Sequence, residues 1–190
     1  MPRAFVAIVP PRDALDAVGK VAWRVAHRRA ELSLPRLLGP RWATRDKWHI
    51  TLQFLGANVD LDAAADALRT VRGAPAHVRL GGVGGFPNAR RANVLWIGVL
   101  EGRESLARLA GAVGDAMAPV VASAEERTFH PHLTLARLTR PADLRAAEAV
   151  TARERVGPRW TVDRLVLFES TAGSDAPRYR PHAEVVLDHP

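Results

Sequence analysis

Hydrophobic and polar residues follow two periods along the chain, and these periods predict strands and helices. Apolar and polar residues alternate, as they do in strands, near residues 4–9, 49–55, 76–83, 93–100, 132–137, 160–168 and 179–187. Apolar residues recur at helical spacing after Asp13 and over residues 60–73, 103–118 and 142–153. The pattern therefore predicts strands and helices that follow one another along the whole chain.

Cap and turn residues predict where several of these elements end. Asp13 and Asp60 are expected to cap the first two helices, and Gly73 lies at the expected end of the second. The inward stripes are Leu15, Val18, Ala22 and Val25 in the first helix, and Leu61, Ala64, Leu68 and Val71 in the second. Residues 31–46 are rich in Pro, Gly and Arg, so they are expected to form a loop.

The order of the elements predicts one domain of α+β class that covers residues 1–190. Two similar halves follow one another, and the second begins with the helix near residue 103. No low-complexity stretch and no long linker divides them. A chain of 190 residues is long enough for two lobes that share a core.

A tetrapeptide is repeated inside two of the predicted strands. His49-Ile50-Thr51-Leu52 recurs 83 residues later as His132-Leu133-Thr134-Leu135. A single H-x-T is a weak motif, because chance alone produces about a third of one in a chain of this composition. The pair is much more specific, since both copies continue with Leu and both lie in alternating runs.

The alternation of a strand predicts what each motif displays. Side chains at i and i+2 share a face, so His49 and Thr51 point one way and Ile50, Leu52 and Phe54 point to the core. The second copy places His132 and Thr134 opposite Leu133 and Leu135 in the same manner. Two such strands would bring two imidazoles and two hydroxyls to one substrate.

With these motifs the sequence resembles the two-histidine (2H) phosphoesterases, and within them the RNA 2′,3′-cyclic phosphodiesterases, also called 2′-5′ RNA ligases. The resemblance covers nearly the whole chain. It includes the segments Arg3–Ile8, Trp48–Gly56, Gly84–Pro87, Val94–Trp96, Phe129–Arg137, Phe168–Ser170 and Arg178–Tyr179. One departure is Arg180-Pro181-His182, which interrupts the alternation of the last strand. The resemblance implies two pseudo-symmetric lobes, each an antiparallel-rich sheet backed by helices, with the H-x-T strands facing each other across a central groove.

The resemblance also implies an activity, the hydrolysis of RNA or nucleoside 2′,3′-cyclic phosphates to 2′-phosphates. His49 would be the general acid that protonates the leaving 3′ oxygen, and His132 would be the general base that activates water. Thr51 and Thr134 would hold the phosphate. This chemistry suits two histidines, because in-line attack needs a base and an acid on opposite sides of the phosphorus. The scheme requires no metal and no cofactor.

Further residues are weaker candidates for the site. Arg137 ends the second motif and would neutralise phosphate charge, but its parity places it on the opposite face unless a bulge turns it. Phe5, on the first strand, would stack on a base, although ordinary core packing explains a strand aromatic equally well. For Arg90 and Arg91 an RNA contact or a solvated loop is expected, and for His130 a structural role. His182 receives no role.

Composition agrees with this interpretation without establishing it. The formal net charge is +7 and the calculated isoelectric point is about 11.2, which suits a polyanion such as RNA. However, 25 of the 27 basic residues are Arg, which base composition of the genome also explains. The absence of cysteine excludes a disulfide framework and a thiolate metal site. With no signal peptide or membrane span in the sequence, a cytoplasmic protein without membrane contact, expected to be a monomer, is the default.

Three alternatives remain open from the sequence. The fold could bind nucleotides or RNA without turnover. The same site run in reverse could join a 2′,3′-cyclic phosphate to a 5′-hydroxyl, which would make a 2′-5′ RNA ligase, although water competes with that reaction. A histidine metal site is the third possibility.

Overall fold

The computed structural model describes residues 3–74, 76–121, 128–171 and 177–187. The strands are β1 (Arg3–Ile8), β2 (Arg41–Trp42), β3 (Ile50–Ala57), β4 (Ala76–Phe86), β5 (Ala92–Glu101), β6 (His132–Ala142), β7 (Arg155–Val162), β8 (Arg164–Thr171) and β9 (Arg178–Val186). The α-helices are α1 (Arg12–His27), α2 (Leu61–Leu68), α3 (Arg103–Met117) and α4 (Arg145–Thr151). Short 3-10 turns lie at Arg29–Leu32, Arg45–Lys47 and Ala89–Arg91. Among these described residues no helix is long and apolar enough to cross a bilayer.

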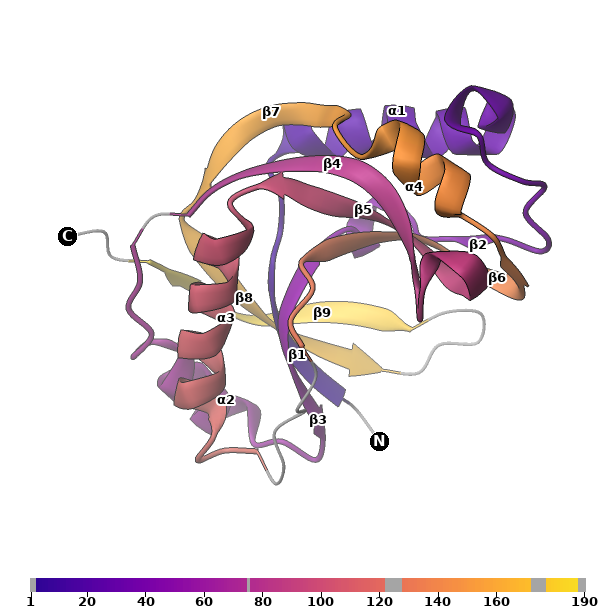
Figure 1. The fold of residues 1–190 in the computed structure, drawn as a ribbon. Coiled ribbons are helices and arrows are strands. Elements are labelled where there is room, and N and C mark those ends of the chain that lie inside the picture. Colours follow the sequence, from indigo (N-terminus) through magenta and orange to yellow (C-terminus); the bar gives the residue numbers. More distant parts are fainter. Residues whose placement is uncertain (1–2, 75, 122–127, 172–176, 188–190) are drawn as a thin grey trace.

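The strands form one curled antiparallel sheet in the order β7-β4-β5-β6-β3-β1-β8-β9, with β2 added to β6 (Figure 1). The order reads as two groups of four strands that meet where Ile50 lies opposite Leu133. We name the group β3, β1, β8 and β9 the His49 lobe, and the group β6, β5, β4 and β7 the His132 lobe. The expected α+β fold with two antiparallel lobes is confirmed.

Each lobe is covered by its own pair of helices. Helices α2 and α3 pack on the His49 lobe, and α1 and α4 pack on the His132 lobe (Figure 1). The two lobes are not the two sequence halves, because β1 pairs with β3 and β8 while the helix that follows it covers β7. The expectation of consecutive halves is therefore wrong, although the pseudo-symmetry itself is present.

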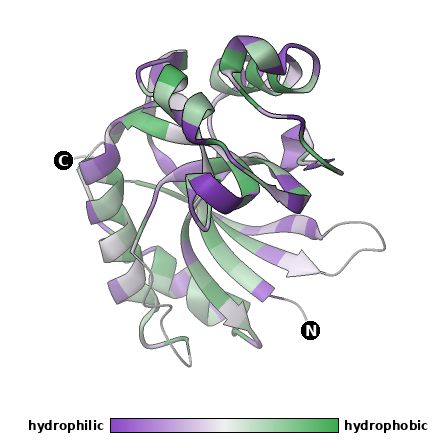
Figure 2. Ribbon diagram, turned by 45° about the vertical axis from the view of Figure 1, so that its right-hand side comes forward, coloured by the Kyte–Doolittle hydropathy of each residue, from purple (hydrophilic) through white to green (hydrophobic). Residues whose placement is uncertain are grey.

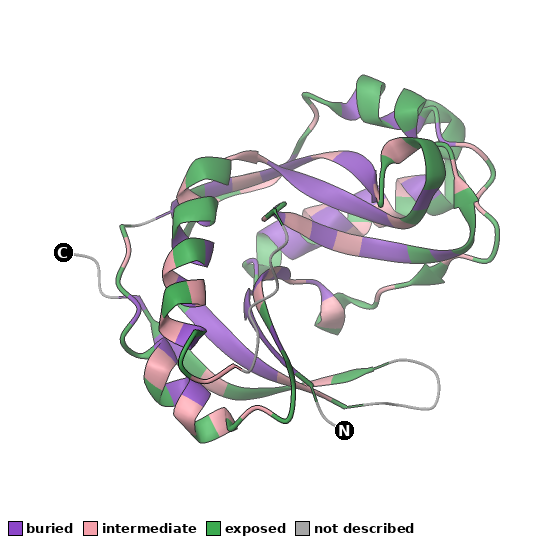
Figure 3. Ribbon diagram, turned by 60° about the horizontal axis from the view of Figure 1, so that its bottom comes forward, coloured by how far each residue is buried: buried purple, intermediate pink, exposed green. Residues whose placement is uncertain are grey.

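A single large core lies between the helices and the sheet and continues through both lobes. Ile50 and Leu133 are both fully buried at the seam between the lobes. Hydrophobic residues follow the strands through the middle of the molecule, whereas the helices alternate between apolar and polar residues (Figure 2). Buried residues correspondingly follow the strand centres and the inner sides of the helices (Figure 3).

Several expected element ends differ in the structure. Helix α1 begins after Pro11, whose backbone is extended, and the Asp13 carboxylate accepts a hydrogen bond from the neighbouring Ala14 N–H without capping the helix. Helix α2 ends before Gly73, with Arg69 as its last cap residue. Part of the expected loop 31–46 pairs with β6 as strand β2.

Three more differences concern the C-terminal half. The expected strand 160–168 is two strands, β7 and β8, which separate at Asp163. The helix expected over 142–153 is shorter, because β6 continues to Ala142. The departure noted at Arg180-Pro181-His182 is a register shift beside Phe168, which faces Pro181. Proline lacks the N–H that regular pairing needs.

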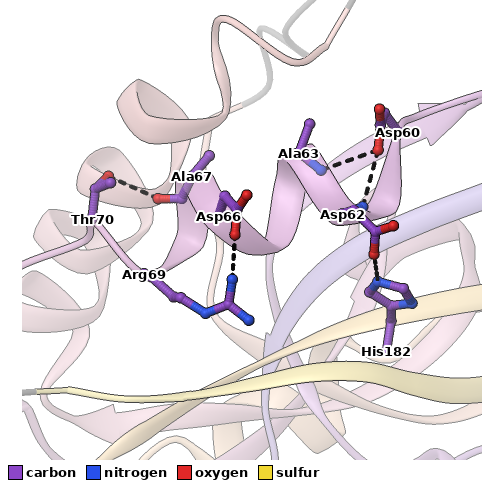
Figure 4. Close-up of polar contacts among 8 residues, drawn as sticks. All are labelled: Asp60, Asp62, Ala63, Asp66, Ala67, Arg69, Thr70 and His182. Carbon is purple, nitrogen blue, oxygen red and sulfur yellow. Dashed lines mark hydrogen bonds and ion pairs between the residues drawn. The ribbon is translucent and has the colours of Figure 1, made fainter.

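Helix α2 is fixed at its start and against β9 (Figure 4). The Asp60 carboxylate accepts hydrogen bonds from the backbone N–H groups of Asp62 and Ala63, both at 3.0 Å, so the expected cap is confirmed. The His182 ring lies 3.1 Å from the Asp62 carboxylate and connects the last strand to this helix. His182 is thus placed at a helix–strand contact of the His49 lobe.

Candidate active site

The two H-x-T motifs lie side by side on neighbouring antiparallel strands. Because Ile50 is opposite Leu133, one step along each strand places His49 beside Thr134 and Thr51 beside His132. All four of these side chains are partly buried, whereas Ile50 and Leu133 point into the core. We call the opposite side of the sheet, which carries the four motif residues, the motif face. The structure therefore brings together all four predicted residues.

The same irregularity occurs in both motif strands. In β3, Thr51 pairs with Ala7 and Gln53 with Val6, so Leu52 has no partner residue on β1. In β6, Thr134 pairs with Trp96 and Ala136 with Leu95, so Leu135 has none on β5. These equivalent bulges reverse the alternation of each strand immediately after its motif.

The bulges change which later residues reach the motif face. Arg137 reaches this face through the bulge that the sequence analysis requires for it. Its positive charge acts to lower the pKa values of His132 and Tyr179, in each case as a smaller effect than burial. Phe54 also comes to this face, where it is 54% exposed and its ring centre lies 6.2 Å from that of Phe5. The expectation that Phe54 points into the core is wrong, because the bulge at Leu52 turns Phe54 to the motif face and buries Leu55 instead.

Aromatic rings surround His49. Its ring stacks on Phe5 with 4.9 Å between centres, and Phe5 in turn stacks on Phe168 at 5.1 Å and meets Tyr179 edge-on at 5.1 Å. Tyr179 meets His49 edge-on at 5.4 Å. Phe5 is only 3% exposed, so it has no open face for a base. The expected stacking role does not fit this placement, and Phe5 instead supports the catalytic candidate His49 from behind.

The second histidine has an equivalent surrounding on the His132 lobe. Phe86 lies edge-on to His132 with 4.7 Å between ring centres, and Trp96 lies 6.2 Å away. The ring of His130 is 6.5 Å from that of His132 and closer to Trp96. Tyr179, Phe86 and Trp96 were not among the site residues expected from the sequence, although each lies in a segment of the resemblance.

Each motif histidine is held by the backbone carbonyl two residues before it. His132 Nδ1 lies 2.7 Å from the His130 carbonyl oxygen, and the Lys47 carbonyl accepts a hydrogen bond from the His49 ring. A carbonyl can only accept, so His132 Nδ1 carries its proton and Nε2 is left available to a ligand. The two imidazoles are thus oriented by the same local device.

Burial dominates the electrostatics of both rings. It lowers the pKa of His49 from 6.5 to about 4, against the opposing hydrogen bond to Lys47, and the charge of His132 adds to the lowering. Burial also lowers the pKa of His132, which the His130 carbonyl opposes and the charges of His130 and Arg137 reinforce. Both histidines are therefore neutral in the ligand-free protein near pH 7. Burial raises the pKa of Tyr179, so its hydroxyl stays a donor.

The remaining candidates have less defined surroundings. Within the described residues, the hydroxyls of Thr51 and Thr134 have no hydrogen-bond partner, which leaves them available to a ligand. Arg90 and Arg91 are exposed in a short turn whose Asn88 side chain accepts from the Arg91 N–H. Two hollows elsewhere on the surface are lined by other residues and contain none of the motif side chains.

Comparison with known proteins relates this arrangement to one family. A sequence model of the 2′-5′ RNA ligase superfamily matches residues 16–174. An RNA 2′,3′-cyclic phosphodiesterase of Aquifex aeolicus is 28% identical over 198 residues, and the match covers 97% of each chain. One of Aeropyrum pernix is 36% identical over 95 residues, which are 49% of this chain and 54% of that protein. The crystal structure of Escherichia coli LigT in its apo form superposes with a TM-score of 0.69 at 26% identity, and the match covers 98% of both chains.

Proposed function

Because the chain belongs to the 2′-5′ RNA ligase superfamily, we propose that it hydrolyses RNA or nucleoside 2′,3′-cyclic phosphates to 2′-phosphates. The relatives from Aquifex and Aeropyrum carry the name of this activity. The observation that supports it best is the cross-strand arrangement of the motifs, with each histidine beside the threonine of the other copy. Such a site offers two proton-transfer groups and two hydroxyl donors to one phosphate.

The reaction assigns one step to each histidine. Neutral His132 removes a proton from water through Nε2, and the water oxygen forms a new bond to phosphorus. The bond from phosphorus to the 3′ oxygen breaks on the opposite side, and His49 in its protonated form gives a proton to that oxygen. The phosphate remains on the 2′ oxygen. The order of these roles follows the family resemblance.

The bound phosphate itself prepares the acid. His49 has a pKa of about 4 in the ligand-free protein, so it must gain a proton when substrate binds. An anionic phosphate beside the ring favours the imidazolium and raises its pKa. The hydroxyls of Thr51 and Thr134 donate to the non-bridging oxygens, where charge grows at the transition state, and Arg137 contributes its positive charge.

This scheme uses no metal ion, because the two histidines supply the acid and the base, and the two hydroxyls with Arg137 supply the groups that stabilise the anion. The activity is therefore expected to persist after treatment with a chelator.

The proposal is tested with a 2′,3′-cyclic nucleotide, purified protein and the variants His49→Ala and His132→Ala. Each replacement should lower kcat by about 100- to 10,000-fold, the usual contribution of one acid or base. The wild type should form the 2′-phosphate in the presence of EDTA. His27→Ala, at the exposed end of α1, is the matched control and should retain activity. A 3′-phosphate product, loss of activity in EDTA, or an active and folded motif variant would contradict the mechanism.

A further inference from the structure

We infer that the motif face of the His132 lobe continues into a binding surface for the RNA strand next to the cyclic phosphate, so that the preferred substrate is an RNA end and not a mononucleotide. This inference rests on the proposed function. It is carried by four arginines, Arg79, Arg103, Arg155 and Arg159, which we call the arginine strip.

A row of paired residues connects His132 to the arginine strip. Across four neighbouring strands, His132 lies opposite Gly98, Gly98 opposite Gly81, and Gly81 opposite Arg155. Three strand spacings of about 4.8 Å separate the ends of this row, so they are on the order of 14 Å apart. The two middle residues are glycines, so no side chain of this row stands between the histidine and the arginine.

The parity of the strands places the strip on the same side as the motifs. Leu80 and Val156, the neighbours of Arg79 and Arg155, are buried in the core, so these arginines point to the other face. Arg103 is closer to the site, because a Cβ added at Gly98 would lie 3.8 Å from its guanidinium. Burial lowers the pKa of His130, the ring beside His132, and the charge of Arg103 adds to this lowering.

The far end of the strip has more positive charge than its acid neutralises. Arg79, Arg155 and Arg159 all surround the carboxylate of Glu101, at nitrogen–oxygen distances of 3.2, 4.0 and 3.9 Å. The Arg155 and Arg159 side chains are 70% and 56% exposed, so both remain free to meet a ligand. The exposed Arg155 and Arg159 contribute little to stability through their long contacts with Glu101, which leaves binding as the better explanation for these two cations.

The chemistry of the face fits a strand of RNA. Arginine guanidinium groups bind phosphates through paired N–H donors, and sequence-independent binding to nucleic acid comes mainly from such contacts. The strip begins beside the residues that hold the terminal phosphate, and it leads away from them along one face. Of the acids near this path, Glu101 is shared among three arginines, and Glu148 acts on His130. A chain of phosphates that continues from the cyclic end would follow this row of cations.

The test compares two substrates, a 2′,3′-cyclic mononucleotide and a short oligoribonucleotide that ends in a 2′,3′-cyclic phosphate. The measured quantity is the ratio of kcat/KM for the oligonucleotide to kcat/KM for the mononucleotide. In the double variant Arg155→Gln/Arg159→Gln this ratio should fall about 10-fold. The slope of log KM for the oligonucleotide against the logarithm of salt concentration should decrease by about 1.4, or 0.7 for each lost phosphate contact. Glu101→Gln should act in the opposite direction and raise the ratio.

The matched control is Arg69→Gln/Arg72→Gln, which removes the same charge at the end of α2, on the helix-covered side of the other lobe. An unchanged ratio in the strip variant, or an equal fall in the control, would overturn the inference. A wild type that hydrolyses neither substrate would refute the proposed function instead. In that case, fluorescence anisotropy with the labelled oligonucleotide still measures the affinity of each double variant for RNA. Equal affinities would show that the arginine strip does not bind the RNA strand.

Discussion

At the scale of single residues, both motif histidines share an orientation and a burial that suit proton transfer. A carbonyl two residues earlier holds each ring, and aromatic side chains from the neighbouring strand pack against it. This packing removes water from the imidazole and disfavours its charged form. Protonation of either imidazole is therefore unfavourable in the ligand-free protein, and the negative charge of a bound phosphate offsets this unfavourable free energy.

The buried His49 predicts how stability depends on pH. Its pKa is 6.5 in an unfolded chain and about 4 in the folded protein, so the unfolded state binds more protons between these values. The contribution is fully present above pH 6.5 and is lost as the pH falls toward 4, by up to about 3 kcal/mol. In His49→Gln, urea unfolding in phosphate-free buffer should show a weaker loss of stability over this window. His27→Gln is the control, and a steep loss that is equal in all three proteins would contradict the argument.

Residue-scale predictions from the sequence depended on regular alternation, and they succeeded or failed with it. His49, Thr51, His132 and Thr134 lie before the bulges, so their common face could be predicted. Phe54 lies after one, and nothing in the local sequence marks where the pairing slips. The position of a bulge depends on how two strands pair, so it cannot be predicted from the sequence of one strand. The same limit applies to Phe5, whose burial depends on β8 and β9.

At the scale of elements, helix α2 shows how one cap residue determines where a short helix begins. The Asp60 carboxylate satisfies two backbone N–H groups that the first turn leaves without partners. Asp60→Ala should therefore lower the free energy of unfolding by about 1 kcal/mol, measured by urea denaturation. Asp66→Ala, which removes only an exposed ion pair with Arg69 on the same helix, should change it by less than about 0.5 kcal/mol (Figure 4). Equal losses in both variants would show that the cap does not determine the helix.

Element types were more predictable than element ends. Within the described residues, the periods of two and 3.6 identified every α-helix and all strands longer than two residues, except that β7 and β8 were joined and residues 155–159 of β7 were missed. The apolar patterns of β7 and β8 continue without a break across Asp163, where the chain turns from one strand to the next. Strand β2 was missed because its pairing with β6 depends on a partner far along the chain, and its two residues are too few for a pattern.

At the scale of the whole molecule, the interleaved path of the chain ties the lobes into one folding unit. The chain passes repeatedly from one lobe to the other, so neither lobe consists of one continuous segment. The core also continues through the seam at Ile50 and Leu133. A repeated motif in the sequence predicted the pseudo-symmetry, but consecutive halves did not follow from it, because the periods contain no information on which strands pair.

This architecture predicts that both lobes unfold in a single cooperative transition. The sequence has no cysteine, so Val186→Cys on the exposed surface of β9 allows one dye to report on the His49 lobe alone. In a Trp48→Phe background the four remaining tryptophans, Trp23, Trp42, Trp96 and Trp160, lie on α1, β2, β5 and β7, so their fluorescence reports on the other lobe. The dye and tryptophan signals should share one urea midpoint.

Ile50→Ala, at the seam, should lower the free energy of unfolding by about 2 to 5 kcal/mol, since it leaves a cavity that both lobes line. The decrease should be the same whether it is measured from the dye or from the tryptophans. A dye signal that changes at lower urea than the tryptophan signal would show that the His49 lobe opens independently, and that the seam does not unite the two histidines into one site.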